Sequence, residues 1–275
     1  MKILLCFLMF LIVTNICVAQ KKEKIKGDKE LISTTNLIVE EFSRLEISDN
    51  LKVTIAQSKE NSYILTTDKN LAEVVKLEVN DGILKLYTSA KITGSKKLEI
   101  FLNLKEVSTI ILNDDAELES KGTLISEFFN LTGNHSSKFD LDIDSKNTSI
   151  NLEKNSGGKI EVKSKEISLN LTDRTDLKGD LDADNLTAQV SKSAKLDLNG
   201  KVKNAVFTLK NTADLKAKKM KAGTITLNAS NNTDIYVHAT KNLIIESEGK
   251  SKVYIYGNPK IELKGLTNSS RLIKK

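Results

Sequence analysis

Residues 194–215 have the sequence AKLDLNGKVKNAVFTLKNTADL, which begins and ends with the same pattern of a small, a charged and an apolar residue. Ala194-Lys195-Leu196 recurs 19 residues later as Ala213-Asp214-Leu215. Repetition at this interval is typical of a solenoid, in which each repeat is one coil that buries its apolar side only by stacking on the next coil. The fold is therefore predicted from this repeat.

The pattern continues from about residue 108 to the last residues of the chain, at intervals of 17 to 21 residues. The residue two places before each apolar anchor is small, and the residue one place before it is charged. We expect the small residue to lie where the backbone turns between coils, because a larger side chain would clash there. The anchors are Leu118, Phe139, Ile160, Leu177, Leu196, Leu215, Ile235, Val253 and Leu272.

Each repeat also contains runs in which apolar and polar residues alternate, and such runs predict half-buried strands. Examples are Ile167-Leu169-Leu171, Ile225-Leu227, Ile235-Val237, Val253-Ile255 and Ile261-Leu263. Leucine-rich horseshoes share the period, but they require a fixed Leu and Asn consensus and usually a helix in each repeat. No helical periodicity separates these strands. The sequence therefore predicts an all-β fold, a right-handed parallel β-helix over residues 108–275 with about 19 residues per turn.

The segment 36–107 has a different texture and is expected to be an N-terminal β-rich cap or the start of the solenoid. Two alternating strands flank the polar turn Ser48-Asp49-Asn50, and Asn80-Asp81-Gly82 predicts a hairpin between two further strands. A solenoid needs such a cap, because the first coil otherwise presents an open strand edge.

The N-terminus has the features of an export signal over residues 1–19. Lys2 precedes an apolar run from Ile3 to Val13, and small residues stand three and one places before Gln20. The run is too short to span a membrane as a helix, and the residues before Cys17 fit a lipoprotein signal poorly. Cleavage after Ala19 would leave a chain with no cysteine and no transmembrane segment, which begins with a linker over residues 20–35. We therefore expect an exported protein, located in the periplasm, on the outer-membrane surface or outside the cell.

The composition limits the classes of partner. With 39% hydrophobic and 5% aromatic residues and no Trp, the core must be built from aliphatic side chains. The chain has 42 basic and 36 acidic residues, for a net charge of +6, and the two signs are interleaved. A nucleic-acid binder would instead carry a basic stripe with aromatic residues, so nucleic acid is not expected as a partner.

The residues that could perform catalysis or bind a metal are sparse. His135 and His238 are the only histidines, about 100 residues apart, and neither is assigned a role. Asp140, Asp142 and Asp144 alternate with apolar residues and are expected to point outward together. Carboxylate oxygens are ligands for Ca²⁺, so these three form a candidate metal site, although outward acids on strands are usually only solvated. No catalytic residue and no cofactor are expected.

Three tyrosines near the C-terminus form the candidate binding site. Tyr236, Tyr254 and Tyr256 are expected to face outward, and the first two hold the same position in adjacent coils. Their rings should stack about 5 Å apart, and tyrosine faces can contact sugar rings or peptide side chains. The alternative is an aromatic ladder that only stiffens the outer sheet.

Roughly residues 36 to 258 resemble a known family, in which the small, charged and apolar signature of the later turns is similar too. The run from Phe42 to Gln57, the following Asp68-Lys-Asn-Leu-Ala-Glu and the strand after Asn80-Asp81-Gly82 are similar to the opening of the putative autotransporter adhesin head GIN domain, found in exported proteins common in Bacteroidetes. Ser48-Asp49-Asn50 departs from the glycine-rich first turn of that family. The resemblance implies a right-handed β-helix outside the cytoplasm with an adhesive or structural role and without known catalytic residues.

Two functions from different classes are consistent with these observations. The first is an exported, non-enzymatic, adhesin-like or cell-envelope module that binds a glycan, an envelope protein or a host protein. The alternative is a carbohydrate-active enzyme that uses surface carboxylates in a groove, as many β-helix enzymes do. The missing Trp and the absence of paired histidines argue against the enzyme.

Overall fold

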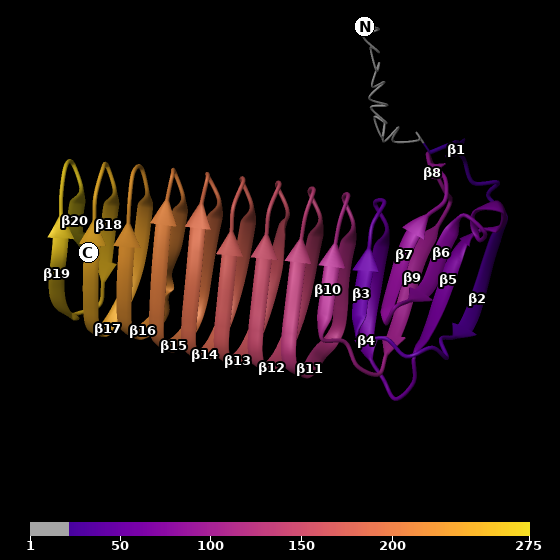
Figure 1. Cartoon of the computed structure of the whole chain (residues 1–275), viewed down its shortest axis with the longest axis horizontal. Helices are drawn as coiled ribbons and strands as arrows, with labels where there is room; N and C mark the ends of the chain where they lie inside the picture. Colours follow the sequence, from indigo (N-terminus) through magenta and orange to yellow (C-terminus); the bar gives the residue numbers. More distant parts are fainter. Residues whose placement is uncertain (1–21) are drawn as a thin grey trace, which may run out of the picture.

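The computed structural model describes residues 22–275, so the export signal predicted over residues 1–19 lies outside the described residues. The described chain is a long rod of stacked coils with a broader cap at its N-terminal end (Figure 1). The parallel β-solenoid is confirmed, and the only helical element described is a short 3-10 turn, η1 (Lys69–Leu71). No helix within residues 22–275 has the length and apolar character needed to cross a membrane.

The body of the rod consists of long strands, one for each coil, that pair in parallel in the order of the sequence. Neighbouring coils are offset by 19 residues over most of their length, as in the pairing of Lys138 with Gly157. Pairing is interrupted in the middle of each strand, at Lys146 and Lys165 for example, where the chain bends. The strand halves before and after this bend form two walls that enclose the core. The strands are β11 (Glu117–Gly133), β12 (Lys138–Leu152), β13 (Gly157–Leu171), β14 (Asp176–Ser191), β15 (Lys195–Lys210), β16 (Asp214–Ala229) and β17 (Asp234–Ser247).

Successive coils are joined by tight turns, most of which contain two residues of positive φ. In the turn Asn113–Ala116, Asp114 and Asp115 have φ values of 49° and 60°, and the Ala116 amide donates to the Asn113 carbonyl at 3.1 Å. These features define a type I′ turn. The turns also stack, because the Asp115 amide donates to the carbonyl of His135 in the next turn at 2.9 Å.

A small residue precedes the charged residue of every repeat, but not because it lies at the bend of the turn, as the sequence suggested. Ala116 and its counterparts Ser137 and Ala194 are fully buried just after the turn rather than at its bend. They point into the corner between the two walls, where a larger side chain would not fit beside the identical position of the next coil.

One predicted anchor is wrong. Phe139 pairs with Gly158, and Gly158 pairs with Leu177, so Gly158 occupies the anchor position and Ile160 lies two residues beyond it. A Cβ atom on Gly158 would lie only 2.1 Å from the Phe139 carbonyl oxygen and 2.8 Å from its ring. The large Phe139 side chain therefore also fills the space that an apolar anchor of the next coil would occupy. Only glycine fits at position 158.

The charged residues of the repeat form an outward column, interrupted at Gly157, in which both opposite and like charges are neighbours. Lys195 pairs in register with Asp176 on one side and Asp214 on the other, but Asp214 also pairs with Asp234. Burial raises the pKa of the Asp214 carboxyl, and the charge of Asp234 raises it further.

Asp214→Asn is therefore expected to raise the melting temperature at pH 7. A carboxyl whose pKa is higher in the folded state stabilises the fold fully below its ordinary pKa of 3.8, and that contribution is lost as pH rises through the folded-state pKa. At pH 3 the substitution should have little effect, because the carboxyl is then protonated in both states. Thermal unfolding followed by circular dichroism at the two pH values measures this. Asp176→Asn, beside the opposite charge of Lys195, should bring no gain at pH 7, and a gain equal to that of Asp214→Asn would contradict the explanation.

The solenoid begins earlier than residue 108. β3 (Arg44–Ile47) and β4 (Lys52–Gln57) already form a coil around the turn at Asp49 and Asn50, and they pair in parallel with β10 (Thr109–Leu112) and β11. Residues 58–107 are an insertion between this coil and the next one. The insertion interrupts the 19-residue period, which is why the repeat is visible in the sequence only after it.

The inserted residues and the N-terminal segment build the cap. β7 (Ile83–Thr88) and β9 (Leu98–Leu104) extend the two walls in parallel, and β6 (Val75–Asn80), β5 (Ser62–Asp68) and β2 (Leu31–Leu37) then cover them in antiparallel fashion. The hairpin expected at Asn80-Asp81-Gly82 is confirmed as the β6–β7 connection. The segment expected as a linker over residues 20–35 instead contains β1 (Lys24–Ile25), which pairs with β8 (Lys91–Ile92), and most of β2.

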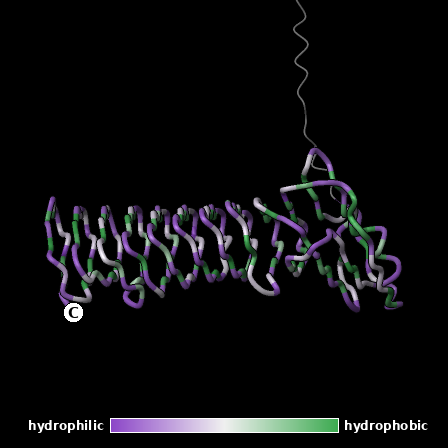
Figure 2. The backbone as a smooth tube through the Cα atoms, turned by 90° about the horizontal axis from the view of Figure 1, so that it is seen from below, coloured by the Kyte–Doolittle hydropathy of each residue, from purple (hydrophilic) through white to green (hydrophobic). Residues whose placement is uncertain are grey.

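The core is a continuous aliphatic column along the rod, with Phe129 and Phe207 as its largest fully buried side chains. Figure 2 shows hydrophobic and hydrophilic positions alternating along every coil. The last coils are β18 (Lys252–Tyr256), β19 (Lys260–Leu266) and β20 (Arg271–Lys274). Ile261 and Leu263, predicted to be half-buried, are 44% and 49% exposed, because no further coil covers β19.

Candidate functional site

The tyrosine patch, which we define as Tyr236, Tyr254 and Tyr256, lies on the first wall near the C-terminal end of the rod. Tyr236 in β17 and Tyr254 in β18 are paired in register, and their rings stack with centroids 4.5 Å apart and planes inclined by 7°. The stacking predicted from the sequence is thus present. The binding role of the three tyrosines stays a prediction.

Charged and apolar groups surround this stack. The Lys275 ammonium lies 5.5 Å from the centre of the Tyr254 ring, and Ile273 of β20 follows Tyr254 in register. Burial raises the pKa of the Tyr236 hydroxyl, and the neighbouring Tyr254 contributes to the rise. The patch therefore presents neutral phenol groups and aromatic ring edges beside a cation, a combination that can contact sugars or peptide side chains.

The three aspartates of the candidate metal site have protein partners. Asp140 and Asp144 lie 3.7 Å and 3.6 Å from the ammonium groups of Lys159 and Lys163 in the next coil. The Asp142 carboxylate accepts a hydrogen bond of 2.6 Å from the Thr123 hydroxyl. Within residues 22–275 no group of three or more His, Cys, Asp and Glu side chains is placed to hold a metal ion. These contacts favour ion pairing over Ca²⁺ ligation, and Ca²⁺ binding stays a prediction.

The two histidines lie far apart along the rod. His135 is in the turn before β12, exposed, with its Nδ1 atom 3.7 Å from the Asp114 carboxylate. His238 is in β17 beside Tyr256 in register, and its Nδ1 atom lies 3.2 Å from the Lys218 carbonyl oxygen. The described fold therefore does not bring them together as a pair.

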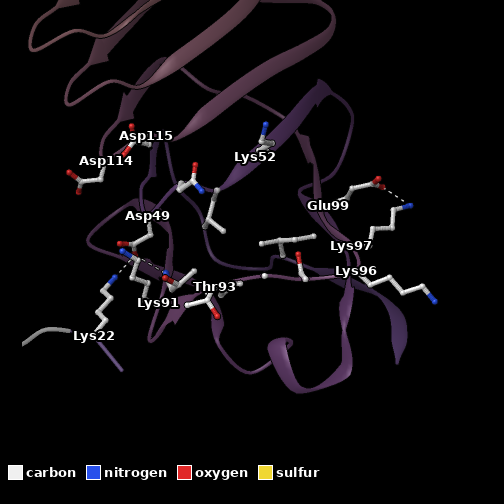
Figure 3. A pocket seen from close by; sticks show the side chains of 17 residues that line it. Lys22, Asp49, Lys52, Lys91, Thr93, Lys96, Lys97, Glu99, Asp114 and Asp115 are labelled. Carbon is white, nitrogen blue, oxygen red and sulfur yellow. Dashed lines mark hydrogen bonds and ion pairs between the residues drawn. The ribbon is translucent and has the colours of Figure 1, made fainter. Parts of the chain in front are cut away.

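A groove of about 1060 Å³ lies where the β7–β9 connection passes the first turns of the solenoid. Figure 3 shows Asp114 and Asp115 at one side of the groove and Lys97 with Glu99 at the other. Lys97 and Glu99 form an ion pair of 2.9 Å, and Asp49 pairs with Lys22 and accepts from the Thr88 amide. Much of the charge in the groove is thus already paired within the protein.

Sequence reasoning did not find this groove. Its shape depends on the path of residues 89–97, which follows from no periodic pattern, and the Lys96-Lys97 pair is the one feature that could have pointed to it.

A buried carboxylate holds the same connection in place. Asp68 is fully buried and accepts a hydrogen bond of 2.7 Å from the Lys96 amide. A Cβ atom on Gly27 would lie 2.0 Å from the Asp68 carboxylate, so the N-terminal segment needs glycine at this point. Asp68 therefore has a structural role, in which it accepts a hydrogen bond from the β7–β9 connection and packs against the N-terminal segment at Gly27.

Three crystal structures share the fold. A putative adhesin from Parabacteroides merdae ATCC 43184 has a TM-score of 0.69 at 15% identity, over 92% of this chain and 99% of its own. A putative adhesin from Parabacteroides distasonis ATCC 8503 has a TM-score of 0.70 at 17% identity, over 92% of this chain and 100% of its own. A putative lipid binding protein from the same Parabacteroides distasonis strain has a TM-score of 0.65 at 19% identity, with the same coverage. At such identities the likeness concerns the fold alone.

Sequence comparison identifies the family. No curated protein matches the chain. The family model described as "Putative auto-transporter adhesin, head GIN domain" matches residues 41–162 and 151–259, from the first coil to the end of β18. Since these two matches cover most of the sequence, the chain belongs to the putative auto-transporter adhesin, head GIN domain family.

Proposed function

We propose that this protein is an exported, non-enzymatic interaction module of the adhesin type that contacts a glycan or a protein surface without a cofactor. The observation that carries the proposal is the tyrosine patch, where the Tyr236 and Tyr254 rings stack on a rigid wall 4.5 Å apart. Rings that are already ordered lose little conformational entropy on binding, so such a patch binds at low cost. Family membership and the export signal predicted from the sequence support the location outside the cytoplasm.

The arrangement of the carboxylates supports the non-enzymatic function over the carbohydrate-active enzyme. A glycosidase needs two carboxyl groups that flank the scissile bond, one of them with a raised pKa. On the first wall Asp182 instead pairs with Lys201 of the next coil at 3.2 Å, and at the bend Asp184 pairs with Lys203 at 2.7 Å. Asp214, which has a raised pKa, faces only Asp234 and lysines in the outer column. In a pocket on that wall, Glu117 and Glu99 likewise pair with Lys52 and Lys97, at 2.7 Å and 2.9 Å.

The tyrosine patch is tested by binding of Tyr236→Ala/Tyr254→Ala and of wild type to a panel of polysaccharides, host-matrix glycans and envelope proteins. Each mixture is run on size-exclusion with detection of both protein and sugar. We expect at least one partner to co-elute intact with wild type and to bind the double variant about tenfold more weakly, since loss of an aromatic anchor costs more than about 1 kcal/mol.

Tyr87→Ala is the matched control, because Tyr87 is a half-exposed tyrosine of the cap, on β7. It should bind like wild type. Shortened glycan chains would contradict the non-enzymatic function, and equal binding by the double variant and wild type would exclude the tyrosine patch as the contact.

A further inference from the structure

The second wall of the rod carries an outward surface that is almost without charge. We call it the uncharged face and define it by the outward residues of the second strand halves from β11 to β16. One of its rows runs Thr132, Asn151, Asn170, Gln189, Thr208 and Asn228. The row two residues earlier in each coil holds hydroxyl and amide groups and Val206, and the row two residues before that contains one charge, Glu166. The other charge of the face is Lys210, at the end of β15. Outward rows of the first wall, in contrast, are built mainly of Asp, Glu and Lys.

The two walls also differ in how their polar groups are used. On the first wall the charges neutralise one another across coils, as in the pairs Asp182–Lys201 and Asp144–Lys163. On the uncharged face, residues such as Asn170 and Gln189 are exposed, and within residues 22–275 no protein group bonds to their side chains. The uncharged face therefore offers free donors and acceptors, whereas the first wall largely satisfies its own.

The free groups form a regular grid. Adjacent coils place equivalent side chains about 4.8 Å apart, and the rows are about 6.6 Å apart along the strands. The edge row is further ordered by amide contacts, because the Asn204 amide donates to Asn185 at 2.9 Å and the Asn185 amide donates to Glu166 at 2.7 Å. An extended polymer with a repeating pattern of hydroxyl groups can meet such a grid at several coils at once.

Exposed apolar groups also lie on this face. Phe128, which begins the edge row, is 53% exposed. Val206 in the middle row is 39% exposed. Aromatic and aliphatic side chains among hydroxyl and amide groups are the composition expected of a site for sugars, whose rings have apolar faces and polar edges.

Together these observations select the class of ligand. Nucleic acids and other polyanions are bound through clusters of Lys and Arg, which the uncharged face lacks. Protein interfaces are usually anchored by several buried aromatic and Arg side chains, and here Phe128 is the single aromatic. We propose that the uncharged face binds an extended, uncharged polysaccharide along the rod, with Phe128 under one sugar ring. This deepens the proposed interaction role and rests on it, but it places the glycan on the wall opposite to the tyrosine patch.

The test measures the affinity of the purified protein for soluble uncharged polysaccharides (hydroxyethyl cellulose, dextran and mannan) and for the polyanion heparin, by affinity electrophoresis. We expect one uncharged polysaccharide to retard the protein and heparin not to retard it more. Asn170→Lys/Gln189→Lys should bind at least tenfold more weakly, because two charges would have to lose water on contact. Phe128→Ala should also lower the affinity about tenfold. Both substituted side chains of Asn170→Lys/Gln189→Lys point to solvent, so the double variant should fold like wild type.

Two controls separate this inference from the proposed function. Lys178→Gln/Lys216→Gln changes the first wall and should bind like wild type, as should Tyr236→Ala/Tyr254→Ala. If the tyrosine variant alone loses the polysaccharide, the uncharged face is not the site, while the proposed function stands. If none of the uncharged polysaccharides is retained, or if the face variants bind like wild type, the inference is overturned.

Discussion

Gly158→Ala is expected to lower the free energy of unfolding by about 3 kcal/mol, the upper end of the usual cost of overpacking a core. The new Cβ would lie 2.1 Å from the Phe139 carbonyl oxygen, and backbone atoms cannot move aside as a flexible side chain can. The Phe139 ring, 2.8 Å away, would also have to shift in a core where it is 4% exposed. Chemical denaturation followed by circular dichroism measures the change.

Gly179→Ala is the matched control for this substitution. Gly179 lies in the next coil, and its new Cβ would meet only the ends of the Leu198, Leu181 and Ile160 side chains, at 3.0 Å to 3.4 Å. The free energy of unfolding of Gly179→Ala should differ from that of wild type by less than about 1 kcal/mol, since side-chain ends can adjust. Equal losses for the two variants would show that the tight contact between Gly158 and Phe139 does not control packing at this coil.

The same glycine shows where sequence reasoning about the fold succeeds and where it fails. The 19-residue period and the alternation within strands predict the solenoid because every coil repeats the same burial pattern. The anchor pattern fails at Ile160, because the apolar volume of one coil was supplied by Phe139 of its neighbour. Such compensation between coils is not visible from residue classes alone. The strands of the coil at β3 and β4 were predicted, but the sequence left open whether they belong to the cap or to the solenoid, since the insertion of residues 58–107 hides the period.

The candidate sites divide in the same way. Tyr236 and Tyr254 could be placed together from the sequence, because they hold the same position in adjacent coils. The residues of the uncharged face occur in segments such as Ser168-Leu169-Asn170 and Thr187-Ala188-Gln189. That they form one surface can be recognised only when the register of the second strand halves is known. The groove beside Asp49 depends on the path of a non-repeating connection and could not be predicted.

Phe129→Ala is expected to lower the free energy of unfolding by about 3 to 5 kcal/mol, because Phe129 is one of the two largest fully buried side chains of the core. Phe129 faces Thr148 in the next coil, and so small a neighbour cannot fill the cavity that the ring would leave. Phe128→Ala, one residue earlier, is the matched control: the same side chain is removed from a position 53% exposed, and stability should change by less than about 1 kcal/mol.

The region of the rod that Phe129→Ala destabilises shows whether the coils unfold locally or as one unit. In a solenoid each coil contacts only its neighbours, so a weakened interface should first open locally. Hydrogen exchange should therefore quicken most in β11 and β12, while β15 and β16 retain their protection until global unfolding. Uniformly faster exchange along the whole rod would contradict this, and would mean that the coils unfold as a single cooperative unit despite their nearest-neighbour contacts.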